Sequence, residues 1–262
     1  MPQFNYLRNM IKVVIIGGGN VAHHLTTHLL KNTTVKLVQV YNRNLDKIKH
    51  LKSLTSITNN LADLKDADIY IISISDNAIT SLSSKLNFKD KLVVHTSGSI
   101  AMDELQSTSN KGVLYALQSF SKDREVDFST IPICIEAETK KDLLLLEKLA
   151  ASISNNVYKI NSEQRKSLHV AAVFVNNFVN HLYHIGNEVC LQNKIPFKIL
   201  LPIIQETAAK LYTLSPFEAQ TGPAKRNDTV TIEKHKTMLT KNQKEMYTLL
   251  TKSIYKTYGE KL

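Results

Sequence analysis

The stretch IKVVIIGGGNVA, residues 11–22, carries the strongest indication of how this chain folds. An apolar, β-branched run ends in a glycine-rich turn, and a helical stretch then continues to about His28. Gly17 allows the tight turn, Gly19 lets a pyrophosphate approach the backbone, and Ala22 keeps the helix close to the sheet. The free amides and the dipole at the helix start would face the phosphates. The pattern predicts a dinucleotide site; the alternative is a glycine-rich turn that binds no ligand.

Composition places the chain among soluble globular proteins. Its 262 residues suffice for one large domain or two modest ones, with 43% hydrophobic and 21% charged residues. Cys134 and Cys190 lie in apolar contexts without metal-type spacing, which predicts a reducing cytoplasm and no metal site. No stretch has the length of a membrane span, and residues 1–10 lack a signal-peptide core and read as a short arm.

The net charge of +10 does not predict a nucleic-acid partner. The lysines are spread along the whole chain, and the aromatic residues do not interleave with them as a stacking platform requires. A mildly basic surface would instead attract an anionic cofactor or substrate.

The first half alternates short apolar runs with helical stretches. Further strands are expected at 35–41, 68–74, 91–96, 113–117, 131–137 and 157–160. Helices are expected between them at 45–54, 77–86, 100–106 and 140–153. Continuous apolar strands alternating with helices predict an α/β fold, a Rossmann-type doubly wound and mainly parallel sheet. Ligands of such sheets bind at the carboxyl ends of the strands.

The end of the second expected strand predicts which dinucleotide binds. Sites that prefer NAD usually place Asp or Glu here for the ribose hydroxyls, whereas this chain has Asn42 and Arg43 after Tyr41. An arginine can pair with a 2′-phosphate and stack on adenine, so NADP is the expected cofactor. A solvated loop arginine is the alternative.

Small polar residues follow the next two expected strands. Ser73-Ile74-Ser75 could approach the ribose and the pyrophosphate, and Asp76 could cap the following helix. The run Ser97-Gly98-Ser99 suits the edge of a nicotinamide pocket, although turn formation and N-capping explain it almost as well. His95, just before it, is either a catalytic group or a satisfied histidine at a strand end.

From Ser162 onward the pattern is helical. No proline interrupts residues 162–194, and further helices are expected after Pro196 and at 229–239 and 241–258. This change predicts two domains, a Rossmann domain at 1–160 and an all-α C-terminal domain at 161–262. The long helix is too apolar to stand alone, so we expect a homodimer.

Polar residues recur along the long helix. Four of them share one side at about 100° per residue: His169, Asn176, Asn180 and His184. Arg165 extends this stripe towards the N-terminus, and Asn177 lies to one side of it. Such groups are costly in an apolar helix unless they are bonded, so they either orient a substrate or form hydrogen bonds across a helix interface.

A basic loop, TGPAKRND at residues 221–228, is the other unusual segment. Its Gly-Pro pair sets a rigid turn, and Lys225 and Arg226 are donors for an anion. Asp228 directly precedes a helical run, where it could act as an N-cap. The loop either lines the cofactor cleft or serves only this turn.

The motifs GGGNVAHHL, YNR, DADIYIISISD and VVHTSGS resemble the N-terminal domains of pyrroline-carboxylate reductases and β-hydroxyacid dehydrogenases. The chain is most similar to bacterial Rossmann-type NADP oxidoreductases with an uncharacterised helical C-terminal domain, in which sequences similar to LYALQSF, HVAAVFVNNF and TGPAKRND recur. This resemblance covers nearly the whole chain. It implies an NADP-binding domain, a helical dimerisation domain and an active cleft between them.

The resemblance assigns roles to individual residues. It implies cofactor contacts from Gly17, Gly19, Asn20, Val21, Asn42, Arg43 and Ser73. It implies a substrate side formed by His169, Asn177, Arg226 and Asp228. Three features depart from the related families. The basic loop reads Arg-Asn-Asp instead of Arg-Gly-Asp, the lysine–asparagine helix pair of the β-hydroxyacid dehydrogenases is not cleanly present, and the Gly-Gly-Thr-Thr loop of the reductases is absent.

These observations predict a cytoplasmic, dimeric NADP-dependent oxidoreductase that acts on a small, anionic metabolite. His169, or a water positioned by Asn177, would handle the proton, and Arg226 would hold the anionic group. No membrane or nucleic-acid partner is expected, and no constellation supports a covalent nucleophile. The alternative is a non-catalytic NADP-binding sensor or assembly module.

Overall fold

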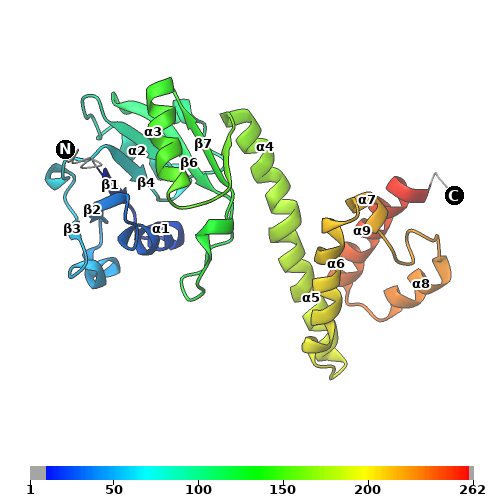
Figure 1. The fold of residues 1–262 in the computed structure, drawn as a ribbon. Helices are drawn as coiled ribbons and strands as arrows, with labels where there is room; N and C mark the ends of the chain where they lie inside the picture. The colour runs from blue at the N-terminus through cyan, green and yellow to red at the C-terminus, as the bar shows by residue number, and fades with distance from the viewer. Residues whose placement is uncertain (1–9, 260–262) are drawn as a thin grey trace, which may run out of the picture. The chain divides into compact units, whose positions relative to one another are not determined.

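An eight-stranded sheet forms the first part of the chain in the computed structural model, which describes residues 10–259 (Figure 1). The strand order is β3-β2-β1-β4-β5-β6-β7-β8, and every neighbouring pair is parallel except β6 with β7. The strands are β1 (Ile11–Ile16), β2 (Val35–Tyr41), β3 (Ser56–Thr58), β4 (Ile69–Ile72), β5 (Leu92–His95), β6 (Asn110–Ala116), β7 (Ile133–Ala137) and β8 (Val157–Lys159). The predicted Rossmann-type, mainly parallel sheet is confirmed.

The central strands form because their side chains are apolar on both faces. Along β1, Val13 and Ile15 belong to one core cluster, whereas Val14 and Ile16 belong to another. Since successive strand residues point to opposite faces, both faces of the sheet are covered. Strand order reverses between β1 and β4, so the carboxyl ends of these two strands flank the usual ligand crevice of such sheets.

Four α-helices accompany the sheet in the first unit: α1 (Asn20–Leu30), α2 (Ile79–Ser83), α3 (Lys140–Ala151) and α4 (Ser162–Ala172). Two predicted helices are wrong. The segment 45–54 holds only two 3-10 turns, because Ile48 lies between them with a φ of −124°, outside helical values. The segment 100–106 holds a single 3-10 turn, Met102–Glu104, in which Glu104 accepts from the Ala101 amide. The helix predicted at 77–86 shortens to α2.

The second part of the chain is helical. It contains α5 (Val179–Gln192), α6 (Leu201–Ala209), α7 (Pro216–Ala219), α8 (Thr229–Thr237) and α9 (Lys241–Tyr258), and no strand lies between 174 and 259. The predicted all-α C-terminal region is confirmed. The chain divides into two compact units after Val173, which assigns α4 to the first unit, whereas the predicted domain boundary lies before that helix, near residue 160.

Helical backbone runs from Ser162 to Gln192, but the segment Val173–Phe178 is π-helical. A π-helix places more residues in each turn than an α-helix. The spacing of about 100° per residue therefore fails between His169 and Asn176, and the predicted single polar stripe is wrong.

Several large apolar side chains of the second unit are exposed in the single chain. The most exposed are between 62% and 93% accessible: Phe174, Val175, Leu191, Ile199, Ile203, Tyr212, Val230, Met238 and Leu249. No helix among residues 10–259 is both long and apolar enough to span a membrane. Within the same range, no cluster of three or more His, Cys, Asp or Glu side chains is placed to hold a metal ion.

Candidate functional site

A pocket of about 630 Å³ lies in the first unit, lined by the loops that follow β1, β2, β4 and β5. The ten residues predicted to contact the cofactor all line it: Gly17, Gly19, Asn20, Val21, Asn42, Arg43, Ser73, Ile74, Ser75 and Ser97. The structure therefore brings together side chains that come from four separate strand ends. Their contact with a cofactor stays a prediction.

The three consecutive glycines each have a different reason to lack a side chain. Gly17 has a φ of +146°, and a Cβ there would lie 1.9 Å from the carbonyl oxygen of Ser73. A Cβ on Gly18 would lie 1.9 Å from Nδ2 of Asn42. A Cβ on Gly19 would meet no atom within 4 Å. Gly17 is thus required by the backbone itself, a side chain on Gly18 would displace the Asn42 amide, and Gly19 leaves open space at the pocket.

The start of helix α1 is suited to an anion. Its N-cap, Gly19, has extended backbone and no side chain to accept from the first-turn amides, and that turn contains no acidic residue. The uncapped amides and the positive end of the helix dipole therefore face a part of the pocket that a Cβ could fill without contact. This arrangement fits a pyrophosphate.

The edge of the pocket beyond β2 is cationic. Arg43 is exposed there, and Lys47 and Lys85 line the same pocket. The backbone N–H of Asn42 donates to the carbonyl of Thr58, which fixes the chain just before Arg43. Neither lysine was predicted from the sequence. The position of Lys47, four residues after Arg43 in a short turn, is the signal that points to it. Cations at this edge fit a phosphate group.

The loops after β4 and β5 are tied to each other. The hydroxyl of Ser99 donates to Oδ2 of Asp76 at 2.6 Å, and Oγ of Ser97 accepts from the Ser99 and Ile100 amides at 3.1 Å. The prediction that Asp76 caps the next helix is therefore wrong, because its carboxylate is engaged by Ser99 and no side chain caps α2.

His95 is a buried histidine at a strand end. Its side chain has no exposed surface, its Nδ1 accepts from the Ser97 amide at 3.2 Å, and Nε2 has no hydrogen-bond partner in the described range. Burial, reinforced by the positive charge of Arg165, lowers the pKa of His95 to about 4. Because His95 does not line the pocket, the structure favours the structural interpretation over the catalytic one.

His169 faces the pocket together with a residue that the sequence analysis missed. Nδ1 of His169, on α4, and the hydroxyl oxygen of Tyr115, on β6, are 3.1 Å apart. Both residues line the pocket, and burial raises the pKa of Tyr115 to about 12. The signal for Tyr115 was its place near the carboxyl end of an apolar strand, where ligands of such sheets bind.

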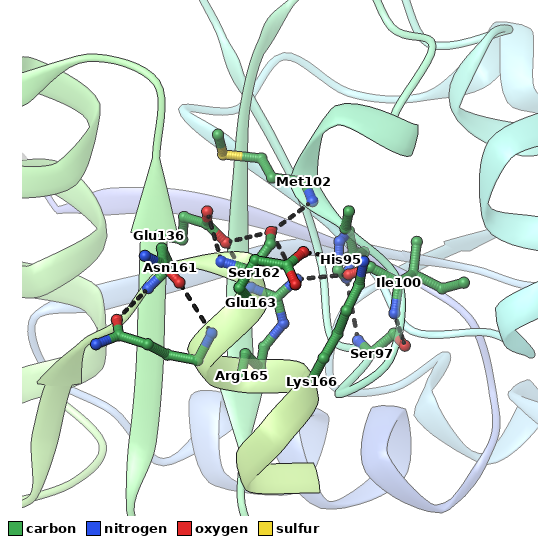
Figure 2. A network of polar contacts seen from close by, with 12 residues as sticks. His95, Ser97, Ile100, Met102, Glu136, Asn161, Ser162, Glu163, Arg165 and Lys166 are labelled. Atoms are coloured by element: carbon green, nitrogen blue, oxygen red, sulfur yellow. Dashed lines mark hydrogen bonds and ion pairs between the residues drawn. The ribbon is translucent and has the colours of Figure 1, made fainter. Parts of the chain in front are cut away.

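Arg165 does not extend the predicted polar stripe of the long helix. Its guanidinium is 1% exposed, forms an ion pair with Glu136 of β7, and donates to the Ile100 carbonyl and to Oγ of Ser162 (Figure 2). Because Glu136 and Ile100 belong to the sheet domain against which α4 packs, the arginine side chain points into the protein. It is not among the residues that line the pocket. It anchors the first turn of α4.

The other three predicted catalytic residues belong to the second unit. Asn177 is exposed in the π-helical segment, and Arg226 is exposed in the basic loop. Asp228 is the N-cap of α8, where Oδ1 accepts from the Thr231 amide at 3.0 Å and Oδ2 from its hydroxyl at 2.7 Å. These hydrogen bonds lower the pKa of Asp228. A substrate role for these residues stays a prediction.

The basic loop explains one departure from the related sequences. Asn227 has a φ of +54°, in the left-handed region that glycine adopts most easily and asparagine tolerates better than most residues. Asparagine can therefore occupy the central position of Arg-Asn-Asp, where the related loops have Arg-Gly-Asp. Lys225 is fixed separately, since its Nζ donates to the Gln220 carbonyl at 2.7 Å.

Comparisons with known proteins give the family. A model described as NADP oxidoreductase, coenzyme F420-dependent, matches residues 12–98, and a domain of unknown function, DUF2520, matches residues 131–254. A protein of Bacteroides fragilis described as a candidate NADP oxidoreductase is 40% identical, with a TM-score of 0.86, over 95% of this chain and 99% of its own. The chain belongs to this family of NADP oxidoreductases. NADP is the cofactor of the family, and no curated protein matches the chain in sequence.

More distant structures share the fold of this NADP oxidoreductase. A reductive aminase from Aspergillus terreus, in complex with NADPH and ethyl-5-oxohexanoate, has a TM-score of 0.72 at 15% identity, over 96% of this chain and 95% of its own. An imine reductase from Myxococcus stipitatus, in complex with NADP+, has a TM-score of 0.65 at 14% identity, over 95% and 96%. At these identities the likeness concerns the fold alone.

Proposed function

We infer that this NADP oxidoreductase transfers a hydride between the nicotinamide cofactor and a small, anionic metabolite. The observation that carries the proposal is one pocket that joins the glycine turn and uncapped start of α1 to His169. A site for the phosphates and a group able to exchange a proton thus share one cavity. NADPH supplies the hydride when it is bound.

The cofactor would be held by backbone at one end and by cations at the other. The amides of Gly19 and of the first turn of α1 would bind the pyrophosphate. Arg43, with Lys47 beside it in the pocket lining, would pair with the 2′-phosphate. Asn42, at the end of β2, takes the position where NAD sites place an acidic residue.

The proton would be handled at His169, or by a water positioned by Asn177. Arg226 would hold the anionic group of the substrate, because its guanidinium is exposed and has the geometry for a bidentate pair with a carboxylate. Asp228 would contribute by fixing the end of this loop, since its carboxylate caps α8.

We further propose that the protein is a cytoplasmic homodimer. The exposed apolar side chains of the second unit, among them Phe174, Val175 and Ile203, support this proposal. Large apolar side chains exposed in this number on one helical unit are typical of a surface that a partner covers. Light scattering at micromolar concentration would test it, and a monomer there would contradict it.

The decisive experiment has two stages. Calorimetry with NADPH and with NADH first measures cofactor binding; no heat with either would overturn the assignment. Turnover is then measured across a panel of 2-oxo acids and imines, with and without a carboxylate on the substrate. Reduction of the anionic members supports the proposal. Tight NADPH binding without any turnover would instead favour a non-catalytic sensor.

A further inference from the structure

Three segments that are far apart in sequence meet beside His169. Its Nδ1 lies 3.1 Å from the Tyr115 hydroxyl oxygen. The two ring centroids are 6.0 Å apart, and the angle between the ring planes is 75°. A Cβ built on Gly98 would lie 2.6 Å from Nδ1 of His169 and 3.0 Å from Cζ of Tyr115. All three residues line the pocket. A side chain at residue 98 would therefore force the imidazole to move from its contact with the tyrosine.

The hydrogen bonds available to this pair are few. In the described part of the chain, the Tyr115 hydroxyl has His169 Nδ1 as its sole partner, and Nε2 of His169 has none. If Nδ1 carried the imidazole proton, the hydroxyl hydrogen of Tyr115, a residue only 8% exposed, would have no protein acceptor. If Tyr115 donates to Nδ1, the hydrogen bond is made and the imidazole proton resides on Nε2.

We propose that Tyr115 is a positioning residue that fixes His169 in the neutral tautomer with its proton on Nε2, so that His169 acts on the substrate as a hydrogen-bond and proton donor. This inference rests on the proposed function, because it assumes that His169 handles the proton of the reduction. Burial raises the pKa of Tyr115 to about 12, so the hydroxyl keeps its hydrogen for this bond at neutral pH.

The pair also accounts for the proton that is transferred. As the proton on Nε2 passes to the substrate oxygen or nitrogen, the Tyr115 proton passes to Nδ1, and the imidazole stays neutral throughout. Nε2 then takes a proton from water and Nδ1 returns its proton to the tyrosine oxygen, which restores the starting tautomer. The positive charge of Arg165 favours this transfer, since it lowers the pKa of Tyr115 against the larger effect of burial.

One buried side chain holds both sides of the contact in place. Arg165 lies one helical turn before His169 and donates to the carbonyl of Ile100, two residues after Gly98 (Figure 2). It also pairs with Glu136 of β7. The helix that carries His169 and the loop that carries Gly98 are therefore fixed to the same guanidinium.

The tautomer can be observed directly in the full chain. In protein labelled with 15N-histidine, protonated and bare ring nitrogens give separate signals, and the His169→Gln variant identifies those of His169. In the neutral imidazole, observed by recording the spectra across a pH series, we expect the proton on Nε2. In Tyr115→Phe we expect a measurable population with the proton on Nδ1. The Tyr158→Phe variant, at a 51% exposed tyrosine, is the matched control and should leave the signals unchanged.

A second variant tests the geometry without removing the hydroxyl. Gly98→Ala places a Cβ against Nδ1, whereas Gly186→Ala adds one where nothing lies within 4 Å. With a reducible substrate, Tyr115→Phe and Gly98→Ala should each lower kcat at least about tenfold while the NADPH Kd stays unchanged, and Gly186→Ala should not. A proton on Nδ1 in the parent, or a tautomer unaffected by Tyr115→Phe, would overturn the proposal. Absence of turnover alone would instead contradict the proposed function, since the tautomer is read without substrate.

Discussion

Arg165 and Glu136 form a buried ion pair that joins the first turn of α4 to strand β7. The arginine side chain is 1% exposed and that of the glutamate 15%. Since α4 also carries His169, the pair fixes the position from which this histidine enters the pocket. It differs from the ion pairs at the surface, such as that of Lys159 with Glu147, whose side chains are 51% and 37% exposed.

Replacing Arg165 with Met should therefore destabilise the protein strongly. Loss of one partner leaves the Glu136 carboxylate without its counter-charge, which costs about 3–5 kcal/mol for a buried pair. Lys159→Met removes an exposed pair and should cost less than about 1 kcal/mol. Thermal or urea unfolding measures both. An equal decrease in the free energy of unfolding in the two variants would show that the Arg165 pair does not anchor α4.

Two glycines of the turn after β1 should affect different properties, one the stability of the fold and the other the affinity for NADPH. Gly17→Ala forces a Cβ against the Ser73 carbonyl at an unfavourable φ, so the variant should unfold at a clearly lower temperature. Gly19→Ala meets no protein atom, so it should fold normally and lose NADPH affinity at least about tenfold, as calorimetry would show. Unchanged NADPH binding in a folded Gly19→Ala protein would contradict the position given to the pyrophosphate.

Arg43 should determine the preference for NADPH. Arg43→Ala removes the proposed partner of the 2′-phosphate, a charge-assisted contact expected to be worth roughly a factor of ten or more in affinity. Titration with both cofactors should show a large loss for NADPH and a small one for NADH. Equal losses would mean that the arginine does not contact the phosphate.

His169→Gln should separate chemistry from cofactor binding. The amide can still form hydrogen bonds but cannot exchange a proton, so kcat should fall by about 10²- to 10⁴-fold while the NADPH Kd is preserved. His184→Gln, at a side chain 62% exposed, serves as the matched control. Full activity in the His169 variant would end its proposed role.

His95 predicts a pH dependence of stability. Its pKa falls from 6.5 in the unfolded chain to about 4 in the fold, so the unfolded state binds the proton first as the pH decreases. The contribution of His95 to the free energy of unfolding is fully present above pH 6.5. It is lost progressively as the pH falls from 6.5 to 4, by about 3 kcal/mol in total.

The matched variant for this dependence is His95→Asn, whose side-chain oxygen can still accept from the Ser97 amide. It should flatten the stability profile across this pH range, measured by urea unfolding at each pH. An identical slope in the parent and the variant would contradict the assignment to His95.

Much of the fold could be predicted because its signals are local. The strand β2 and the helix α9 have the predicted bounds, since their apolar patterns are continuous and end at clear boundaries. The residues predicted to contact the cofactor came from strand ends, from the glycine motif and from the family resemblance, and they line one pocket because parallel strands bring their carboxyl ends to one edge. The turns at 45–54 could not be predicted, because Ile48 and Leu51 suit a helix equally well.

The features that were missed depend on contacts between distant segments. Tyr115 becomes relevant only when β6 brings it to His169, which lies 54 residues later. Arg165 was predicted only as part of a polar stripe, because the sequence does not show that Glu136 and the Ile100 carbonyl are its partners. Gly98 occurs in a run of small residues that suggests an ordinary turn, and only the packing shows that a methyl group there would strike the imidazole.

Every residue that lines the nucleotide pocket comes from the chain before Val173. Under the proposed function, Asn177, Arg226 and Asp228 contact the substrate from the later part of the chain, so changes there should leave coenzyme binding intact. Among relatives that reduce different metabolites, the sequence differences should therefore concentrate in the codons after residue 173.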